Sequence, residues 1–347
     1  MAFHRLGQKS QPSLKSIALV VGLCSASLIA GNASAKDTLT VYTYDSFTSE
    51  WGAGPIVEEA FEASCDCELE FVALDSSAGI LNRVQLEGES TRADVVLGLD
   101  TNLMALAEDT GLLDTSGVDT SSLALPIDWD SDIFVPFDYG YFAFVYNTEL
   151  MENPPTSFDE LINAPDDVKI IIQDPRTSTP GLGLMLWMKS VYGDEAAAKW
   201  EALQPKILTV TKGWSEAYFS LFLNNEAPMV LSYSTSPGYH IAVDETEQYQ
   251  AAAFSEGHYL QVEVAALLKS SKNKALAREF LAFMLQPEFQ EALPLTNVMY
   301  PATDIGDALP AAFDQLITPA ETLLIDTNTV KENRKAWTSE WLDATTR

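Results

Sequence analysis

Several aromatic side chains lie beside turn-forming residues, where their rings could stack on a ligand. Trp214, Tyr233 and Tyr239 lie among the glycines, serines and prolines of segment 212–240, and Trp51 has a similar setting. Turn residues normally face water, so core packing explains these rings less well than ligand binding does. Such rings stack on flat or cationic ligands, and each cation–π contact contributes roughly 0.5 to 2 kcal/mol. The pattern favours an aromatic ligand site.

Other aromatic residues lie in segments with helical periodicity. Trp187, Trp200, Trp337 and Trp341 fall in predicted helices, as does Tyr218. Burial explains aromatic residues at such positions. We therefore expect these side chains to pack rather than to bind a ligand.

The hydroxyl groups of "RTSTPG" offer a second kind of chemistry. Thr179 as N-cap and Pro180 at the first helical position would begin a helix. The first N–H groups of that helix and the hydroxyls of Ser178 and Thr177 would then be free to hold an anion, with Arg176 beside them. Most Ser/Thr-Pro helix starts are only caps, so the spacing alone leaves both a cap and a phosphate or hydroxyl site open.

Catalysis has little support in this sequence. With the first 35 residues set aside, His240 and His258 are the histidines available for acid–base work. Neither belongs to a metal-binding pair or stands near a G-x-S-x-G nucleophile motif, and the sequence has no P-loop. Cys65 and Cys67 fall in a helix-to-strand connection, at the wrong end of the strand for a site. The sequence predicts no catalytic residue, no metal site and no cofactor.

The elements that would position these residues alternate between strand and helix. The first half of the chain predicts strands at 38–44, 68–74 and 93–99 and helices at 54–63, 78–88 and 101–111. A long apolar run, 134–147, could pass from one lobe to another. The alternation then restarts, with strands at 168–174, 206–213 and 227–234, helices at 181–193 and 215–225, a returning strand at 258–268, and helices at 274–285 and 330–346.

The unusual residues follow the strands of both halves. In α/β sheets a ligand binds outside the carboxyl ends of the strands, where loops vary without disturbing the core. The first strand leads into Tyr44 and Asp45, the second into Asp75 and Ser76, and the third into Gly98 and Asp100. The second half contributes "DPRTSTPG", "GWSEAY" and "SYSTSPGYH" at its strand ends. We expect loops from both halves to face one cleft.

The first 35 residues have the features of a signal peptide. Three basic residues precede the short apolar run "IALVVGLCSASLIAG", and "NASA" supplies the small-x-small pattern. The run is shorter than a bilayer span, so we predict cleavage after Ala35 and a soluble protein in the periplasm. Cys24 raises a lipoprotein alternative, but Leu23 precedes it where a small residue is wanted.

Charge and length bound the class of protein. The chain has 20 Lys and Arg against 50 Asp and Glu, a net charge of −30, and loss of the leader would take it to about −33. This balance argues against nucleic acid and anionic membranes as partners. A cationic ligand fits it, and so does solubility in a salty habitat. About 312 residues remain after cleavage, which exceeds one ordinary core and predicts two lobes.

Two cysteines remain in "SCDCE". The C-x-C spacing is too sparse for a structural zinc site. In an oxidising periplasm a local disulfide between Cys65 and Cys67 is favoured over free thiols. Closing so short a loop should add little stability.

Several long, irregular strings resemble one family. They are "LTVYTYDSF", "ADVVLGLD", "FVPFDYGYFAFVY", "QDPRTSTPGLG", "KGWSEAY", "LSYSTSP" and "FSEGHYLQVEVAA". Together they resemble the periplasmic thiamine-binding proteins that serve bacterial thiamine ABC transporters, over essentially the whole chain after the leader. The resemblance implies thiamine, thiamine monophosphate or thiamine diphosphate as ligand. It also implies an inner-membrane ABC permease and its ATPase as partners.

The resemblance implies an α/β fold of the periplasmic binding protein type, type II-like. Two lobes would be joined by two hinge crossings, with the ligand cleft between them. Residues 1–35 would be the cleaved leader and 36–140 the first part of lobe 1. Residues 141–262 would form lobe 2, and 263–347 would complete lobe 1 and add the C-terminal helices.

Ligand-binding residues follow from the matching strings. Tyr44 would pack on the ligand, with Trp51 seven residues later. Trp214 and Tyr233 would form aromatic walls, with Tyr239 close by.

The polar contacts follow in the same way. Ser178 would be the serine on the phosphate side, next to Thr179. Two positions depart from the family pattern: Ser76 replaces an acidic residue, and Val298 replaces a tryptophan. The thiazolium ring carries a permanent positive charge, so a nearby carboxylate suits it, and Asp45 is the candidate; a turn-capping role for Asp45 stays equally open.

Three other functions have less support in the sequence. A receptor for another organic cation, such as a polyamine, would place several carboxylates at the ligand's ends, whereas these loops offer mainly rings and hydroxyls. Ferric-iron capture lacks a convincing His/Tyr/carboxylate ligand set. A thiamine-cleaving enzyme of related fold would need a cleft cysteine beside an acid, which would have to be Cys65 or Cys67.

Overall fold

The computed structural model describes residues 36–345. The predicted leader, its cleavage after Ala35 and the lipoprotein alternative at Cys24 lie outside the described residues. These described residues belong to one compact unit. Within the described range, no helix combines the length and apolar character needed to cross a membrane.

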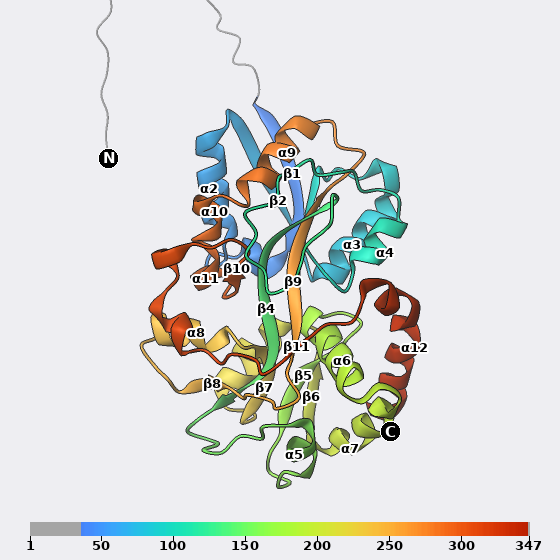
Figure 1. Cartoon of the computed structure of the whole chain (residues 1–347), viewed down its shortest axis with the longest axis vertical. Coiled ribbons are helices and arrows are strands. Elements are labelled where there is room, and N and C mark those ends of the chain that lie inside the picture. Colours follow the sequence, from blue (N-terminus) through green and yellow to red (C-terminus); the bar gives the residue numbers. More distant parts are fainter. Residues whose placement is uncertain (1–35, 346–347) are drawn as a thin grey trace, which may run out of the picture. The chain divides into compact units, whose positions relative to one another are not determined.

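One mixed sheet organises the described part of the chain (Figure 1). Its main path runs β2-β1-β3-β9-β4-β7-β5-β6. The strands are β1 (Asp37–Tyr44), β2 (Cys67–Leu74), β3 (Val95–Asp100), β4 (Phe134–Asn147), β5 (Ile170–Gln173), β6 (Ile207–Thr211), β7 (Met229–Tyr233), β8 (Tyr249–Ala251), β9 (His258–Leu267), β10 (Tyr300–Pro301) and β11 (Thr322–Leu323).

The two halves of the sheet share their central strands. We call β1, β2 and β3, which are mutually parallel, the first half, and β5, β6 and β7, also parallel, the second half. Strand β4 pairs antiparallel with β9 and then, further along, with β7, whereas β9 also pairs with β3. The antiparallel strands β4 and β9 therefore connect the halves (Figure 1).

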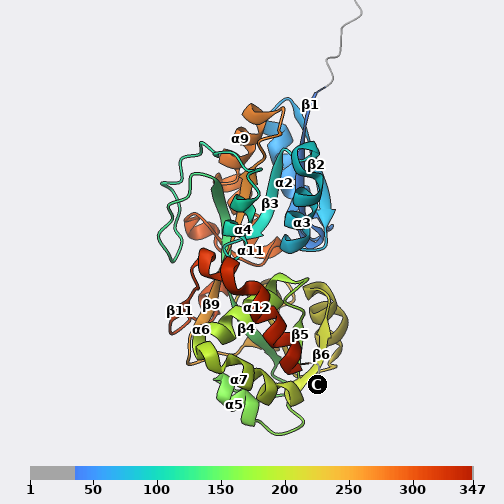
Figure 2. The same cartoon turned by 90° about the vertical axis from the view of Figure 1, so that its right-hand side faces the viewer.

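Helices cover the strands where helical periodicity predicts them. Their bounds are α1 (Asp45–Thr48), α2 (Gly54–Ser64), α3 (Ser77–Glu87), α4 (Met104–Asp109), α5 (Phe158–Asn163), α6 (Thr179–Tyr192), α7 (Ala196–Leu203), α8 (Ser236–Ala242), α9 (Lys274–Phe283), α10 (Pro287–Gln290), α11 (Leu293–Thr296) and α12 (Thr327–Thr345). Helix α12 packs beside α6 and α7 and also contacts α4 (Figure 2). Apart from the helix expected at 215–225, the strands and longer helices expected from the sequence are confirmed to within a few residues.

Two elements differ from the sequence expectation. Residues Ser236–Ala242 form α8, so Tyr239 lies on a helix rather than in a loop. The predicted helix at 215–225 is a π-helical turn, Glu216–Leu221, followed by a 3₁₀ turn, Phe222–Asn224. π-helical turns widen a helix locally and occur often at functional sites.

Close packing fixes helix α6 against the sheet. A Cβ atom on Gly183 would lie 2.0 Å from the ring of Phe142 on β4. Glycine at this position therefore lets the helix approach the central strand closely. Trp187, Trp200 and Trp341 are buried, as the sequence predicts for tryptophans on helices. Helix α6 thereby presents its N-terminus at a fixed place beside β5.

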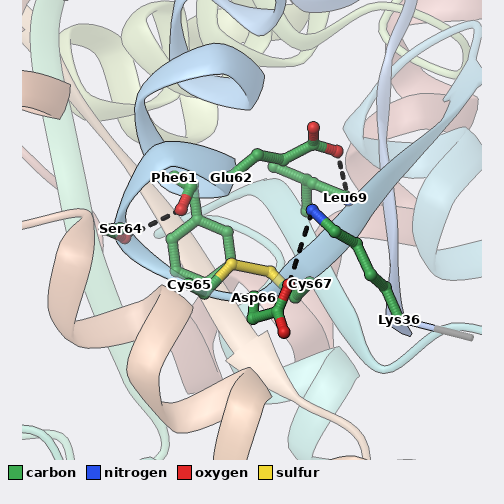
Figure 3. Close-up of a disulfide and its surroundings, with 8 residues drawn as sticks. All are labelled: Lys36, Phe61, Glu62, Ser64, Cys65, Asp66, Cys67 and Leu69. Atoms are coloured by element: carbon green, nitrogen blue, oxygen red, sulfur yellow. Dashed lines mark hydrogen bonds and ion pairs between the residues drawn. A yellow bond between two sulfur atoms is a disulfide. The ribbon is translucent and has the colours of Figure 1, made fainter. Parts of the chain in front are cut away.

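Cys65 and Cys67 form a disulfide that joins the end of α2 to the start of β2 (Figure 3). Asp66, between the two cysteines, pairs at 3.7 Å with Lys36, which directly precedes β1. Neither cysteine lines a cavity described below. The two sulfur atoms are bonded to each other, so neither cysteine offers a free thiol.

Candidate functional site

Two adjoining cavities lie at the strand ends. A polar cavity of about 350 Å³ is lined by Tyr44, Asp45, Asp75, Ser76, Ser77, Thr177, Ser178, Thr179, Pro180, Lys212, Gly213, Trp214, Ser215, Glu216, Tyr233, Ser236, Glu263, Asn297, Val298 and Met299. An aromatic cavity of about 340 Å³ is lined by Trp51, Trp214, Tyr218, Phe219, Ser236, Tyr239, His240, Leu295, Thr296 and Val298. Trp214, Ser236 and Val298 line both, so the two spaces adjoin.

The residues selected from the sequence lie around these cavities. The polar cavity contains Tyr44, Asp45, Ser76, Ser178, Thr179, Trp214 and Tyr233. The aromatic cavity contains Trp51, Tyr239 and again Trp214. Residues from both halves of the sheet thus meet at one place, as expected for loops at the carboxyl ends of strands.

Tyr44 is held at the end of β1 by its ring and by its hydroxyl. Gly98 has a φ of 96°, at an irregularity in the β3–β9 pairing, and a Cβ there would lie 2.3 Å from the Tyr44 ring. The Tyr44 hydroxyl donates to Glu263 Oε2 at 2.6 Å and accepts from Asn297 Nδ2 at 2.9 Å. Burial, reinforced by the charge of Glu263, raises the pKa of Tyr44 well above its usual value, so the hydroxyl remains a donor.

Tyr233 reaches the same strand from the second half. Its hydroxyl donates to Gln261 Oε1 at 3.0 Å, and Gln261 Nε2 donates to Glu263 Oε1 at 2.9 Å. The Tyr233 ring lies 5.1 Å from that of Phe142. Rings contributed by the two halves are therefore tied to neighbouring positions on β9.

Glu263 was missed by the sequence analysis. It is 6% exposed, on the crossing strand, and its carboxyl lines the polar cavity. Burial raises the pKa of Glu263 to about 8, against the lowering effect of the hydrogen bond from Tyr44. The alternation of "HYLQVEVAALL" places Gln261 and Glu263 on one face of a strand that is otherwise apolar, which is the signal that could have identified them.

Asp138 on β4 extends this buried polar group. Asn297 Nδ2 donates to Asp138 Oδ2 at 2.6 Å. Burial, with the charge of Glu263 as the next cause, raises the pKa of Asp138 well above its usual value. Asp138 Oδ1 has no hydrogen-bond partner within the described part of the chain. The crossing strands β4 and β9 thus carry two acidic groups close to the polar cavity.

Trp214 forms the wall between the two cavities. Its Nε1 donates to Ser232 Oγ at 2.8 Å, and its ring stacks on Tyr218 at 5.0 Å with an interplanar angle of 22°. Phe219 meets Trp214 edge-on at 5.1 Å and Trp51 edge-on at 5.4 Å. The π-helical turn supplies both Tyr218 and Phe219, so it builds the aromatic cavity.

Trp51 is 47% exposed, an unusual position for the largest apolar side chain. It lines the aromatic cavity from the first half of the sheet. Tyr218, expected to be buried, is 3% exposed and is among the residues that line that cavity.

The two histidines of the described residues have structural partners. His240 Nε2 lies 2.9 Å from the Tyr218 hydroxyl, and His240 Nδ1 lies 2.7 Å from Asp244. His258 is buried, accepts from the Phe254 N–H at 3.0 Å and contacts the Phe142 carbonyl at 2.8 Å. Burial lowers the pKa of both imidazoles. Neither histidine is arranged with a nucleophile.

The start of α6 lies one residue earlier than predicted. Ser178 is the N-cap and Thr179 the first helical residue, so the assignment of Thr179 as N-cap was wrong by one position. Ser178 is 5% exposed, lines the polar cavity, and its hydroxyl makes no capping hydrogen bond. Ser76, at the start of α3, does cap its helix by accepting from the Gly79 N–H at 3.2 Å.

Two expected contributors do not reach the cavities. Arg176 lines neither cavity, because the adjacent Asp174 carboxylate holds its guanidinium. Arg176 Nε donates to Oδ1 at 2.9 Å and to Oδ2 at 3.1 Å, and Nη2 donates to Oδ2 at 2.5 Å. Asp100 is fully buried and accepts from the Asn102 N–H at 2.7 Å, so the end of β3 does not contribute to the site. Lys212 is the cation of the polar cavity, and the sequence analysis did not select it.

Two contacts between the halves cross the polar cavity. Lys212 Nζ forms an ion pair with Asp75 Oδ2. The hydroxyls of Ser77 and Thr179 lie 2.9 Å apart. Asp45 stands nearby, and burial is the largest cause that raises the pKa of this carboxyl. The polar cavity therefore contains both signs of charge.

The loop "TNVMYP" contributes the remaining wall. Val298 lines both cavities with a φ of 55°, a strained conformation for a β-branched residue. Met299 is 3% exposed and lines the polar cavity beside Gly140. Tyr300 stacks on Tyr139 at 5.2 Å and lines neither cavity. Among residues 36–345, no group of three or more His, Cys, Asp and Glu side chains is placed to hold a metal ion.

The sheet with two crossing strands, and a ligand-sized space at the strand ends of both halves, are the arrangement of a solute-binding protein. Residues 48–291 match the family described as bacterial extracellular solute-binding protein, and the chain belongs to that family. Its fold is the periplasmic binding protein fold, as the sequence predicts.

Similar proteins of known name point to one kind of ligand within this family. The chain is 54% identical over 332 residues to the thiamine-binding periplasmic protein of Brucella suis biovar 1 (strain 1330), covering 96% of this chain and 97% of the relative. It is 53% identical over 325 residues to the thiamine-binding periplasmic protein of Escherichia coli (strain K12), covering 94% and 97%. A solved structure described as a periplasmic thiamin binding protein superposes with a TM-score of 0.87 at 54% identity, covering 90% of this chain and 97% of that one. The chain is accordingly a periplasmic protein.

Proposed function

We propose that this protein captures thiamine and its phosphate esters for uptake by an ABC transporter. The observation that carries the proposal is the junction of an aromatic cavity with a charged one at Trp214. Thiamine joins a flat aminopyrimidine to a thiazolium cation that bears a hydroxyethyl group. The two cavities match these two parts, and the thiamine-binding relatives support the assignment.

The aromatic cavity suits the aminopyrimidine. Trp51, Trp214, Tyr218, Phe219 and Tyr239 supply ring faces and edges. Aromatic pairs of this kind contribute roughly 0.5 to 1.5 kcal/mol beyond the area they bury. We assign Trp51, Trp214 and Tyr239 to this part of the ligand.

The polar cavity suits the cation and its ester. Tyr44, Trp214 and Tyr233 offer rings to the thiazolium, and Asp45 offers a carboxylate. Ser178 and Thr179 at the start of α6 would receive the hydroxyl or the phosphate. Ser76 lines the same cavity, although its oxygen already caps α3.

Enclosure is needed in addition to stacking. Nanomolar capture requires about −12 kcal/mol, whereas two or three rings supply roughly 2 to 5 kcal/mol. We propose that residues 36–140 with 263–347 act as one lobe and residues 141–262 as the other, with hinges in β4 and β9. Closure of the lobes over the ligand would supply the remaining contacts.

Export and transport partners complete the proposal. Cleavage after Ala35 would release the protein into the periplasm. An inner-membrane permease with a cytoplasmic ATPase would then receive the ligand. A role in thiamine cleavage is disfavoured because the sulfur atoms of Cys65 and Cys67 are bonded to each other and lie outside both cavities.

A polyamine is the second candidate, because the polar cavity contains more acid than the loop sequences suggested. Asp45, Asp75 and Glu216 line it, together with Glu263, whose pKa of about 8 keeps its carboxyl largely protonated at neutral pH. Carboxylates of this number suit the ammonium groups of a polyamine. The aromatic cavity fits a polyamine less well, because a linear polyamine has no flat ring to stack on its walls.

The test is calorimetric titration of ligand-free protein with thiamine, thiamine monophosphate, thiamine diphosphate and spermidine. We expect the thiamine forms to bind and spermidine not to compete. Trp214→Ala should weaken all three thiamine forms, and Ser178→Ala mainly the two esters. Tight spermidine binding with no heat from thiamine would refute the proposal in favour of the second candidate.

A further inference from the structure

The ion pair between Lys212 and Asp75 lies inside the proposed ligand cavity. Asp75 follows β2 in the first half of the sheet, and Lys212 follows β6 in the second half. Both residues line the polar cavity. The pair therefore spans the space that a ligand would occupy.

This pair is free to exchange partners. The side chains of Lys212 and Asp75 are 68% and 72% exposed. Exposed ion pairs contribute little to stability, because water screens them and two long side chains must be ordered. A ligand anion in the cavity can therefore replace Asp75 as the partner of Lys212 with little loss elsewhere.

An anion at this place would find one further donor, the Ser178 hydroxyl. The Thr177 hydroxyl donates to the Lys212 carbonyl at 2.7 Å, which fixes the Lys212 backbone beside the start of α6. The Ser178 side chain is buried, with 5% of its surface exposed, and it lines the same cavity. Its hydroxyl makes no hydrogen bond among the described contacts. A cation and an uncommitted hydroxyl thus face one space, which is the combination that a phosphate group requires.

The acidic residues of the same cavity act in the opposite sense. Asp75 and Asp45 attract a cationic ring and repel a phosphate. Only Lys212 among the charged residues lining the cavity does the reverse. The net preference between an unesterified cation and its anionic ester therefore depends on which partner Lys212 holds.

We propose that Lys212 and Asp75 form an exchangeable ion pair that sets selectivity among the charge states of the ligand. With an unesterified ligand, Lys212 stays on Asp75 and the two charges cancel. With a phosphate ester, Lys212 leaves Asp75 and binds the phosphate beside Ser178. The inference rests on the proposed function, since it needs a ligand that exists with and without a phosphate.

The test measures dissociation constants for thiamine, thiamine monophosphate and thiamine diphosphate by calorimetry. The variants are Lys212→Met, Lys212→Arg and Asp75→Asn. Lys331→Met is the matched control, because Lys331 pairs with Asp109 at 3.0 Å and neither residue lines a cavity.

The expected effects have opposite signs. Lys212→Met should weaken both esters by about tenfold or more, through loss of a charge-assisted contact, and bind thiamine at least as tightly as the wild type. Asp75→Asn should tighten the esters and weaken thiamine. Lys212→Arg should keep the wild-type order, and Lys331→Met should change none of the three constants.

Two results for Lys212→Met would contradict the inference. If Lys212→Met shifts all three ligands by the same factor, the ion pair only holds the two halves together and the inference is wrong. If it shifts none of them, Lys212 does not contact the ligand and the inference is also wrong. Failure of the wild type to bind any of the three forms would instead overturn the proposed function.

Discussion

The Tyr44 hydroxyl donates to the carboxyl of Glu263 over 2.6 Å, which links the end of the first strand to the strand that returns between the halves. Gln261 makes the corresponding link to Tyr233 from the second half. Both tyrosine rings of the polar cavity are consequently oriented by β9. Because Glu263 is acidic and buried at this junction, the free energy of unfolding should depend on pH.

Stability should fall as the pH rises through neutrality. The pKa of Glu263 is about 8 in the folded protein, above its ordinary value of 4.5, so the folded chain binds an extra proton between these values. The stabilisation is fully present below about pH 4.5, declines between about pH 4.5 and pH 8 by up to about 1.4 kcal/mol per pH unit for one proton, and is gone above about pH 8. The raised pKa of Asp138 acts in the same direction. Urea unfolding at several pH values measures this slope.

Replacement of Glu263 by a neutral isostere tests whether its carboxyl causes this decline, and an exposed glutamate serves as the control. Glu263→Gln should flatten the decline, whereas Glu288→Gln, on the exposed surface of α10, should leave it unchanged. An identical decline in wild type and Glu263→Gln would assign the pH dependence to other groups.

Gly98 should be indispensable for the position of Tyr44. An alanine there would adopt a φ of 96° and place its Cβ 2.3 Å from the tyrosine ring. We expect Gly98→Ala to lower the free energy of unfolding by about 2 to 4 kcal/mol and to weaken ligand binding. Gly111→Ala separates the two causes, because Gly111 has a φ of 69° but nothing within 4 Å of a new Cβ. Its loss should be only about 1 kcal/mol, with binding intact; equal losses would show that the ring contact is unimportant.

Removal of the disulfide should have a small effect. Cys65 and Cys67 are two residues apart, and closure of so short a loop restricts the unfolded chain by only about 1.5 kcal/mol. The double variant Cys65→Ser/Cys67→Ser should fold, melt slightly earlier and bind thiamine as tightly as the wild type. Loss of binding in a folded variant would mean that the α2–β2 turn communicates with the cavities.

The sequence predicts the strands and the chemistry of their ends, because apolar alternation and turn residues are local signals. It places Trp214 and Tyr233 at the cavities for that reason. It does not find Glu263 or Lys212, since an acid in a crossing strand and a lysine after an edge strand acquire a role only when distant segments meet. The cause at Arg176 is local instead: the carboxylate of Asp174, two residues earlier, holds the guanidinium that was expected beside an anion.

The π-helical turn also exceeds what periodicity reveals. Residues 215–225 have an ordinary helical pattern of apolar positions, so the sequence predicts an α-helix. The wider turn at Glu216–Leu221 brings Tyr218 beneath Trp214 and Phe219 beside it. Tertiary packing of these rings decides the local geometry, and a single-sequence pattern does not contain it.

The aromatic wall should be improved by a ring at position 298. Val298 lines both cavities at a φ of 55°, which a β-branched side chain adopts only under strain. Val298→Trp removes the β-branch and adds an indole face next to the proposed cation and heterocycle. One added stacking or cation–π contact of roughly 0.5 to 2 kcal/mol corresponds to about 2- to 30-fold tighter binding of thiamine. Val298→Leu, which adds volume without a ring, should leave the dissociation constant nearly unchanged; this result would assign the gain to the ring. If leucine tightens binding as much as tryptophan does, the gain comes from filled space and relieved backbone strain, and the ring makes no specific contribution.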